Sequence, residues 1–223
     1  MMEFSINDEI KRIFPDIQVG ILTGDVENTI HNENLWTEID SECESIREKF
    51  DMESIRAFPP ITAGKNAYRS LGKDPNRYRI SSEALLRRIT KGRSLYQIHS
   101  LVDALNLVSI RTGVTIGGFD LTKVIGPVSL GIGKENEEFE AIGRGQLNIH
   151  RLPVYRDQSG AIGSPTSDCT RTMLHADTGT FLMIITGFYG SQWISETLEE
   201  LKKVLEKHVS GRNFDVLPLP LQS

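Results

Sequence analysis

The sequence of 223 residues has few of the features that mark secreted or membrane proteins. Its only cysteines, Cys43 and Cys169, are too few for a disulfide framework or for a zinc site built mainly on thiolates. Its longest apolar run, 181–185, has the length of a strand, whereas a span of the bilayer needs about 20 apolar residues. The first residues lack the basic and apolar regions of a signal peptide. We therefore expect a cytoplasmic protein with reduced thiols and no membrane partner.

Length and composition indicate an ordinary globular chain. Apolar residues make up 39% and charged residues 25% of the sequence, which is close to the usage of folded domains. The length fits one large domain or two small ones that are closely joined. We expect an N-terminal α/β segment over 1–60 that packs on a main domain over 61–210, followed by an irregular tail over 211–223 that contains Pro218 and Pro220.

Apolar spacing and turn residues predict the secondary structure. Leu35, Ile39, Ile46 and Phe50 form an apolar stripe, which predicts a helix over 34–50. Further helices are expected over 4–13, over 83–91 with Ser81 as N-cap, over 98–110 up to Gly113, and over 194–205. Strands are expected over 17–22, 123–132, 139–149, 154–156 and 180–188, the last of them central in a sheet. Because helices lead and strands follow, we predict an α+β fold with a mixed or antiparallel sheet flanked by helices.

The net charge of −5 is unevenly distributed along the chain. Residues 1–64 contain 5 Lys/Arg and 14 Asp/Glu, whereas residues 65–93 contain 9 Lys/Arg and 2 Asp/Glu. We call the cations of the second stretch the basic island: Lys65, Arg69, Lys73, Arg77, Arg79, Arg87, Arg88, Lys91 and Arg93. With tyrosines between them, these side chains suit contacts with the phosphates and bases of a nucleic acid. The alternative is a solvated face that pairs with the acidic N-terminal third.

Motifs for metal or nucleophilic chemistry are weak. No two of the five histidines have the helical spacing of a zinc protease motif, and we expect no metal and no cofactor. Residues 131–134 match a phosphate-binding loop only in part, so a turn between strands is the better interpretation. Cys169 lies in a hydroxyl-rich stretch and could be a nucleophile with His175 as its base. Nothing in the sequence indicates a lowered pKa for this thiol.

Polar residues also flank a group of glycines after the helix predicted over 98–110: Asn106, Arg111, Thr112 and Asp120 around Gly113, Gly117 and Gly118. Glycine lets a backbone approach a ligand closely, and polar groups beside it could bind that ligand. On spacing alone, this pattern predicts either the lining of a pocket or a turn from helix to strand.

The same region resembles a known family. Val102-Asp103-Ala104-Leu105-Asn106-Leu107-Val108, Gly113 and Phe119-Asp120-Leu121 are similar, at matching spacing, to a segment of the B3/B4 module of the phenylalanyl-tRNA synthetase beta subunit. Residues 69–88, 117–121 and 154–157 look like stand-alone B3/B4-domain proteins, so the resemblance covers about 60–190. In the synthetase, this module is named for tRNA binding and hydrolyses tRNA wrongly charged with tyrosine. The resemblance therefore implies an RNA-related function.

Departures from the family pattern bear on catalysis. The histidine of the synthetase editing site falls on Gly117, and its pocket glutamate corresponds to the strand 181–188, which contains no acid. Asn106 matches the pocket asparagine. Hydrolysis of an ester needs a group that stabilises the developing oxyanion, and the backbone amides of Gly117 and Gly118 or the side chain of Arg111 are the candidates here.

The resemblance and the residues together suggest a free-standing B3/B4-type protein that binds tRNA or an aminoacylated tRNA end. The expected pocket for an amino-acid-like group comprises Asp103, Asn106, Arg111, Gly117, Gly118 and Asp120. The alternative for Asp120 is a structural role as the cap of a turn before Leu121, and for Asp103 it is a hydrogen bond within its helix. The expected RNA-binding cations are Arg69, Arg77, Arg79, Arg87, Arg88 and Lys91. We expect replacement of Arg87 and Arg88 by glutamate to abolish RNA retention without unfolding. The alternatives are a trans-acting aminoacyl-tRNA deacylase with altered catalytic residues and a binding protein for a small amino-acid-like molecule.

Overall fold

The computed structural model describes residues 2–188 and 192–219. The helices are α1 (Asp8–Ile13), α2 (Glu33–Lys49), α3 (Met52–Ala57), α4 (Pro59–Ser70), α5 (Ser81–Thr90), α6 (Ser100–Thr112) and α7 (Gln192–Val209). The longer strands are β2 (Gln18–Asp25), β3 (Ile116–Asp120), β4 (Val128–Ile132), β7 (Pro153–Asp157), β8 (Gly160–Ser164), β10 (Thr180–Gly187) and β11 (Arg212–Leu219). The short strands are β1 (Phe4–Ile6), β5 (Glu140–Ala141), β6 (Gly145–Gln146) and β9 (Ser167–Asp168), and 3-10 turns occupy 121–123 and 170–172.

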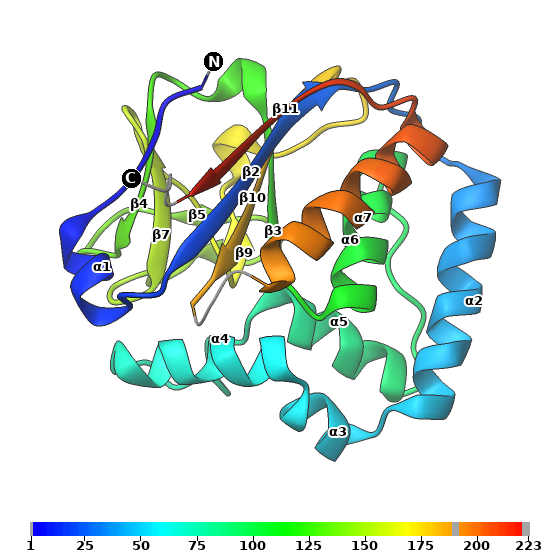
Figure 1. The fold of residues 1–223 in the computed structure, drawn as a ribbon, viewed down its shortest axis with the longest axis horizontal. Helices are drawn as coiled ribbons and strands as arrows, with labels where there is room; N and C mark the ends of the chain where they lie inside the picture. Colours follow the sequence, from blue (N-terminus) through cyan, green and yellow to red (C-terminus); the bar gives the residue numbers. More distant parts are fainter. Residues whose placement is uncertain (1, 189–191, 220–223) are drawn as a thin grey trace.

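The strands form two main sheets. Sheet A has the order β1-β4-β7-β8-β9 and sheet B the order β11-β2-β10-β3, while β5 and β6 form a separate hairpin. Strands β1 and β4 run parallel, and the other pairings are antiparallel. In Figure 1, sheet B crosses the centre of the molecule, α2, α6 and α7 lie on one side, and β4 and β7 of sheet A lie on the other. The predicted α+β fold with mixed and antiparallel sheets is confirmed.

The strands β2, β10 and β3 of sheet B are mostly buried, and β10 is buried on both faces. Along β10, Phe181, Met183 and Ile185 face the core that includes α2, α5, α6 and α7, whereas Leu182 and Ile184 face the core between the two sheets. Burial on both faces explains why this strand is a continuous apolar run instead of an alternating one. Strand β10 lies between β2 and β3, so its predicted central position is confirmed.

The first 60 residues are part of both sheets. Strand β1 pairs with β4 of sheet A, and β2 lies between β10 and β11 of sheet B. The prediction of one helix over 4–13 is therefore wrong at its start, where β1 precedes α1. The prediction of an irregular tail is also wrong over 212–219, because β11 pairs with β2 as far as Leu219, and residues 220–223 of the predicted tail lie outside the described residues. Pro218 is compatible with this strand because β11 is at the edge of the sheet.

Other differences between prediction and structure are local. Helix α5 begins at Ser81 with Ile80 as its N-cap, one position before the predicted cap. The strand expected over 139–149 is the hairpin of β5 and β6, and the strand expected over 123–132 begins only at Val128. Helix α6 ends at Gly113 as predicted, with φ at +72°. No helix among the described residues is long and apolar enough to cross a bilayer.

Candidate functional site

A pocket of about 450 Å³ lies between α6, β3 and β9, and we call it the α6–β3 pocket. Most of its wall is apolar: Ile98, Val102, Leu105, Ile116, Ile142, Met173, Leu174 and Ala176. The polar part of the wall consists of Ser81, His99, Asn106, Ser164, Ser167, Asp168 and His175, beside Gly118. The described wall contains no lysine or arginine, and Asp168 is its one acid. Its size and mainly apolar wall suit a small ligand with an apolar body.

The side chain of Asn28, which follows β2, supports one side of the pocket. Its Oδ1 accepts hydrogen bonds from Ser100 Oγ at 2.9 Å and from the N–H of Leu101 at 3.0 Å. Its Nδ2 therefore donates, to the carbonyl of His175 at 2.7 Å and to Nδ1 of His99 at 3.0 Å. Because Nδ1 accepts, the ring proton of His99 belongs on Nε2. Burial lowers the pKa of His99, so the ring is neutral at pH 7.

Asp168, on β9, brings a carboxyl group to the pocket against the edge of β3. Its Oδ2 accepts a hydrogen bond from the N–H of Gly118 at 3.0 Å. Burial raises the pKa of this carboxyl to about 7, and the hydrogen bond from Gly118 is the one contact that opposes the shift. A carboxyl group that titrates near neutral pH inside a cavity is a common mark of a functional site.

The carboxyl of Asp168 fits here because Gly117 and Gly163 have no side chains. A Cβ on Gly163 would lie 2.7 Å from Asp168 Oδ1, and a Cβ on Gly117 would lie 3.3 Å from it. On the pocket side of β3, a Cβ on Gly118 would lie 2.8 Å from Leu105 Cδ1. The close approach of β9 to β3 therefore depends on glycine in both neighbouring strands.

The structure divides the residues that were predicted to form the pocket. Asn106 and Gly118 line the α6–β3 pocket, and Gly117 lies behind it, next to Asp168 Oδ1. Asp103 does not line the pocket. Its buried carboxylate accepts hydrogen bonds from Trp36 Nε1 at 2.9 Å and from the N–H of Ile98 at 3.0 Å. Asp103 therefore orients the start of α6.

Asp120 also has a structural role. Its Oδ1 accepts hydrogen bonds from the N–H of Thr122 at 3.0 Å and from the Thr122 hydroxyl at 2.6 Å. Its Oδ2 accepts from Thr178 Oγ1 at 3.1 Å. These contacts cap the 3-10 turn after β3, so Asp120 is absent from the wall of the α6–β3 pocket.

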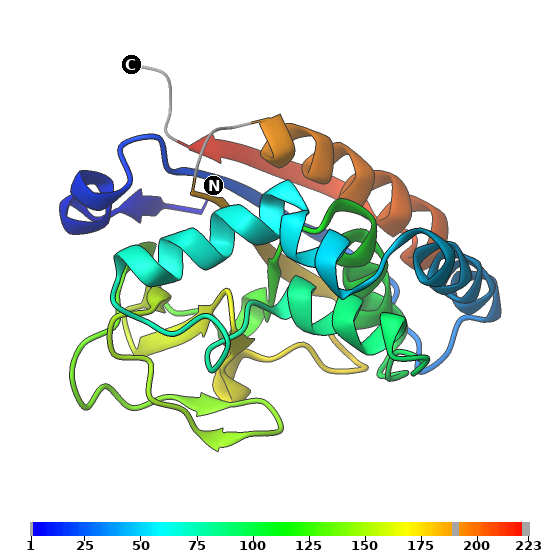
Figure 2. The same ribbon diagram turned by 90° about the horizontal axis from the view of Figure 1, so that it is seen from below.

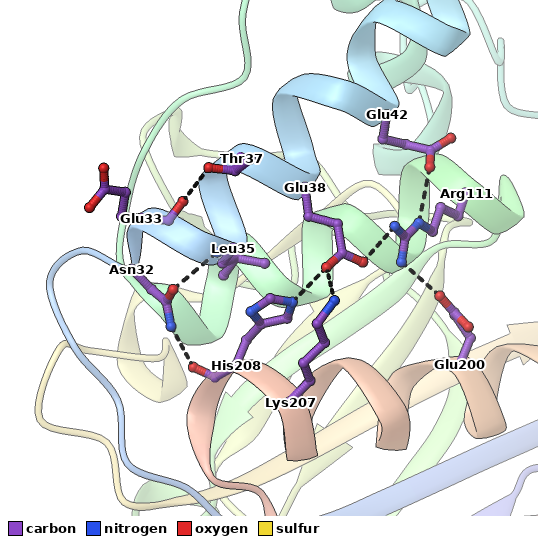
Figure 3. Close-up of polar contacts among 10 residues, drawn as sticks. All are labelled: Asn32, Glu33, Leu35, Thr37, Glu38, Glu42, Arg111, Glu200, Lys207 and His208. Atoms are coloured by element: carbon purple, nitrogen blue, oxygen red, sulfur yellow. Dashed lines mark hydrogen bonds and ion pairs between the residues drawn. The ribbon is translucent and has the colours of Figure 1, made fainter.

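Arg111 lies on the side of α6 that faces α2 and α7 (Figure 3), and it does not line the α6–β3 pocket. Its guanidinium donates to Glu38 at 2.7 Å, to Glu42 at 3.1 Å and to Glu200 at 2.8 Å. The grouping of Arg111 with the pocket is therefore wrong. The residue follows Asn106 by five positions, which on a helix of 3.6 residues per turn turns it toward α2 and α7.

The same network holds Glu38 in its charged form. Burial acts to raise the pKa of Glu38, but hydrogen bonds from Lys207, Arg111 and His208 together lower it to about 2. Figure 3 shows the carboxylate between these three donors, which join α2 to α6 and α7. The network links three helices and requires no ligand to account for it.

Part of the basic island is used to stabilise the fold. The carboxylate of Glu83 is fully buried, and its Oε1 lies 3.3 Å from Lys65 Nζ, 3.6 Å from Arg87 Nη1 and 3.7 Å from Arg79 Nε. The side chains of Lys65 and Arg87 are only 9% and 19% exposed. Replacement of Arg87 by glutamate would put a second carboxylate beside Glu83. We therefore no longer expect the Arg87/Arg88 variant to leave folding intact.

Four of the remaining cations are exposed, at the end of α4, in the loop before α5 and just after α5. They are Arg69, Arg77, Lys91 and Arg93. Arg88 stacks 3.7 Å over the ring of Tyr96, which is itself 65% exposed. Ten residues of α5 span about 15 Å, from Ser81 at the pocket to Lys91 and Arg93 beyond the other end. The pocket and a surface with positive charge therefore lie on one helix.

Sequence reasoning missed the central acid of the pocket. The hydroxyl-rich stretch that contains Asp168 drew attention to Cys169, but Cys169 is buried and does not line the pocket. His175 does line it. The nearest signal in the sequence was the run of glycines in β3, since glycine marks the close approach of another chain segment.

Comparisons with known proteins point in one direction. The family model described as "B3/4 domain" matches residues 63–212. No curated protein matches the chain. Among solved structures, the chain is similar to an N-terminal fragment of the phenylalanyl-tRNA synthetase beta-subunit from Pyrococcus horikoshii, with 13% sequence identity and a TM-score of 0.50. The similarity covers 98% of this chain and 54% of that chain, so this chain spans about half the length of the fragment. At this identity, the similarity concerns the fold alone.

Proposed function

Because the chain belongs to the B3/4 domain family, we propose that it binds tRNA, or the aminoacylated end of a tRNA. In this proposal, the exposed cations of the basic island contact phosphates. The α6–β3 pocket receives the aminoacyl group. The observation that carries the proposal is the position of α5, which starts in the wall of a small apolar pocket and ends among exposed cations.

The geometry favours binding over hydrolysis. The N–H of Gly118, one expected oxyanion donor, is used by Asp168. Backbone groups alternate in direction along a strand, so the N–H of Gly117 points toward β10. Arg111, the third expected donor, is held by three glutamates elsewhere. None of the three oxyanion donors expected from the sequence is therefore available in the described pocket, so hydrolysis by the expected arrangement is not supported.

The test for RNA binding is filter retention of tRNA over a range of salt concentrations. Each phosphate contact contributes about 0.7–0.9 to the slope of log affinity against log salt. A variant with Lys91→Gln and Arg93→Gln should therefore reduce the slope by about 1.4–1.8. A matched variant with Lys11→Gln and Lys203→Gln removes the same charge from α1 and α7 and should keep the native slope. Equal slopes for both variants would contradict the assignment of the phosphates to the end of α5.

A trans-acting deacylase is the second candidate, and the carboxyl of Asp168 is the observation in its favour. A carboxyl with a pKa near the working pH is suited to general base catalysis. Single-turnover assays on correctly and wrongly charged tRNAs, read from the same tubes as retention, separate the two functions. Retention without release supports a binding protein, whereas faster release of one aminoacyl-tRNA that is lost in Asp168→Asn would establish the hydrolase.

A further inference from the structure

The described wall of the α6–β3 pocket has an acidic side chain and no basic one with a fixed charge. Asp168 is the one acid in the described wall, and the wall contains no lysine or arginine. The other titratable side chains in the wall are His99 and His175, and burial favours the neutral form of His99. A ligand that enters the pocket therefore meets one carboxyl group and no fixed positive charge.

Few protein groups solvate the carboxyl of Asp168, which is half-buried in the pocket wall. Its Oδ2 accepts one hydrogen bond, from the N–H of Gly118, and its Oδ1 lies in the space left by Gly117 and Gly163. An ionised carboxylate in a protein interior is costly unless a cation or several donors surround it. The carboxyl therefore retains a proton at neutral pH for part of the time. A cation delivered by a ligand would supply the missing partner.

The rest of the wall limits the chemistry of that ligand. Leu105, Ile116 and Leu174 offer apolar surface beside Asp168, which suits a hydrocarbon body. A negative group on the ligand would lie near Asp168 without a cation to bind it. The pocket should therefore reject a free amino acid, whose carboxylate is ionised at pH 7, while it accepts the same amine with an uncharged acyl end.

We propose that Asp168 is the specificity-determining residue of the α6–β3 pocket, where it binds the ammonium group of a primary amine that has an apolar body and carries no carboxylate. This inference rests on the proposed function in one respect, because an aminoacyl ester is a compound of that class. It adds the residue that recognises the ligand and the reason why free amino acids are excluded.

Three small probes related to leucine test the inference by calorimetric titration at pH 7. L-leucinol has the ammonium and the apolar body without a carboxylate. L-leucine adds the carboxylate, and 4-methyl-1-pentanol lacks the amine. We expect L-leucinol to bind about tenfold or more tightly than either of the other two, because it alone offers an ammonium group to the carboxyl without adding a carboxylate. Because the carboxyl is partly protonated when empty, the binding of L-leucinol should also release protons to the buffer.

Two single variants locate the effect. Asp168→Asn should lower the affinity for L-leucinol to that for 4-methyl-1-pentanol and abolish the proton release. Asp177→Asn removes an exposed carboxylate close by in the chain that does not line the pocket, and it should keep the affinity for L-leucinol within about twofold. Thermal unfolding of each variant verifies that it is folded.

Several results would overturn the inference. These are equal binding of L-leucinol and 4-methyl-1-pentanol, tight binding of L-leucine, native affinity in Asp168→Asn, or no binding of L-leucinol at millimolar concentration. Retention of tRNA is measured separately and depends on other residues. A protein that retains tRNA but ignores L-leucinol would leave the RNA proposal standing and refute this one. A protein that binds L-leucinol but not tRNA would do the reverse.

Discussion

Replacement of Glu83 by glutamine tests how the basic island is held on the fold. The side chain of Glu83 is fully buried, and three cations lie within 3.7 Å of its Oε1. Glutamine has nearly the same shape, so the change removes charge and almost no volume. Lys65, Arg79 and Arg87 would then face one another without an anion between them. Lys65 can hardly escape to solvent, because its side chain is 9% exposed.

The expected loss follows from the burial of the group. Removal of one partner of a buried ion pair costs about 3–5 kcal/mol, and two charges 4 Å apart interact by about 4 kcal/mol at an effective dielectric constant of about 20. The side chains of Arg79 and Arg87 are 31% and 19% exposed, so solvent screens part of their repulsion. We therefore expect a loss of about 3 kcal/mol in the free energy of unfolding, or roughly 6–12 °C in Tm for a chain of this size.

Urea and thermal unfolding measure this loss. Glu199→Gln is the control, because Glu199 pairs with Lys202 on the surface with its side chain 62% exposed, and it should stay within about 0.5 kcal/mol of the native protein. Addition of Lys65→Met to Glu83→Gln should restore part of the stability by removal of the buried cation. A loss in Glu83→Gln no larger than that in Glu199→Gln would refute the reasoning.

Three further predictions concern stability. Gly113→Ala should lower the free energy of unfolding in urea more than Gly92→Ala does. Both glycines have φ near +72°, where a side chain costs about 1–2 kcal/mol. Only at Gly113 would the new Cβ also clash with a neighbour, Phe58. The native protein should lose stability as the pH rises from about 4 to about 7, because Asp168 ionises at lower pH when unfolded. Asp168→Asn should remove that slope and raise the free energy of unfolding by up to about 4 kcal/mol at pH 8. An unchanged slope would contradict the raised pKa of Asp168. For Glu38, whose folded pKa is about 2, stability should be lost as the pH falls from about 4.5 to about 2, and Glu38→Gln should remove this loss in acid titrations followed by circular dichroism.

Strong local patterns made much of the fold predictable. The apolar run 181–185 identifies β10 because a strand buried on both faces has no polar alternation, and Gly113 ends α6 because its backbone is left-handed. Strand β3 could not be recognised, since Gly117 and Gly118 have low strand propensity and the strand depends on pairing with β10. Strand β11 contains a proline, so its pattern resembled a tail.

The site was predictable only where its residues are close in sequence. Asn106 and Gly118 share a short segment, and both line the pocket. The contact between Asp168 and Gly118 joins residues 50 positions apart, so it could not be predicted from local spacing. Likewise, composition identifies a basic stretch, but the packing of α4 against α5 decides that Lys65 serves Glu83 instead of a ligand.

The position of β2 between β10 and β11 affects the order in which the chain can fold during synthesis. Its two partners, β10 and β11, lie far downstream in the chain, so β2 leaves the ribosome long before either of them is made. Asn28 likewise donates to the carbonyl of His175, which lies 147 positions later in the chain. Pairings this distant slow folding and leave apolar strands unprotected in the meantime. Figure 2 shows β2 beneath β11 and α7. A chain cut to the family match at 63–212 would lack β2 and therefore the centre of sheet B. It would also lack Asn28, the side chain that positions His99 in the pocket.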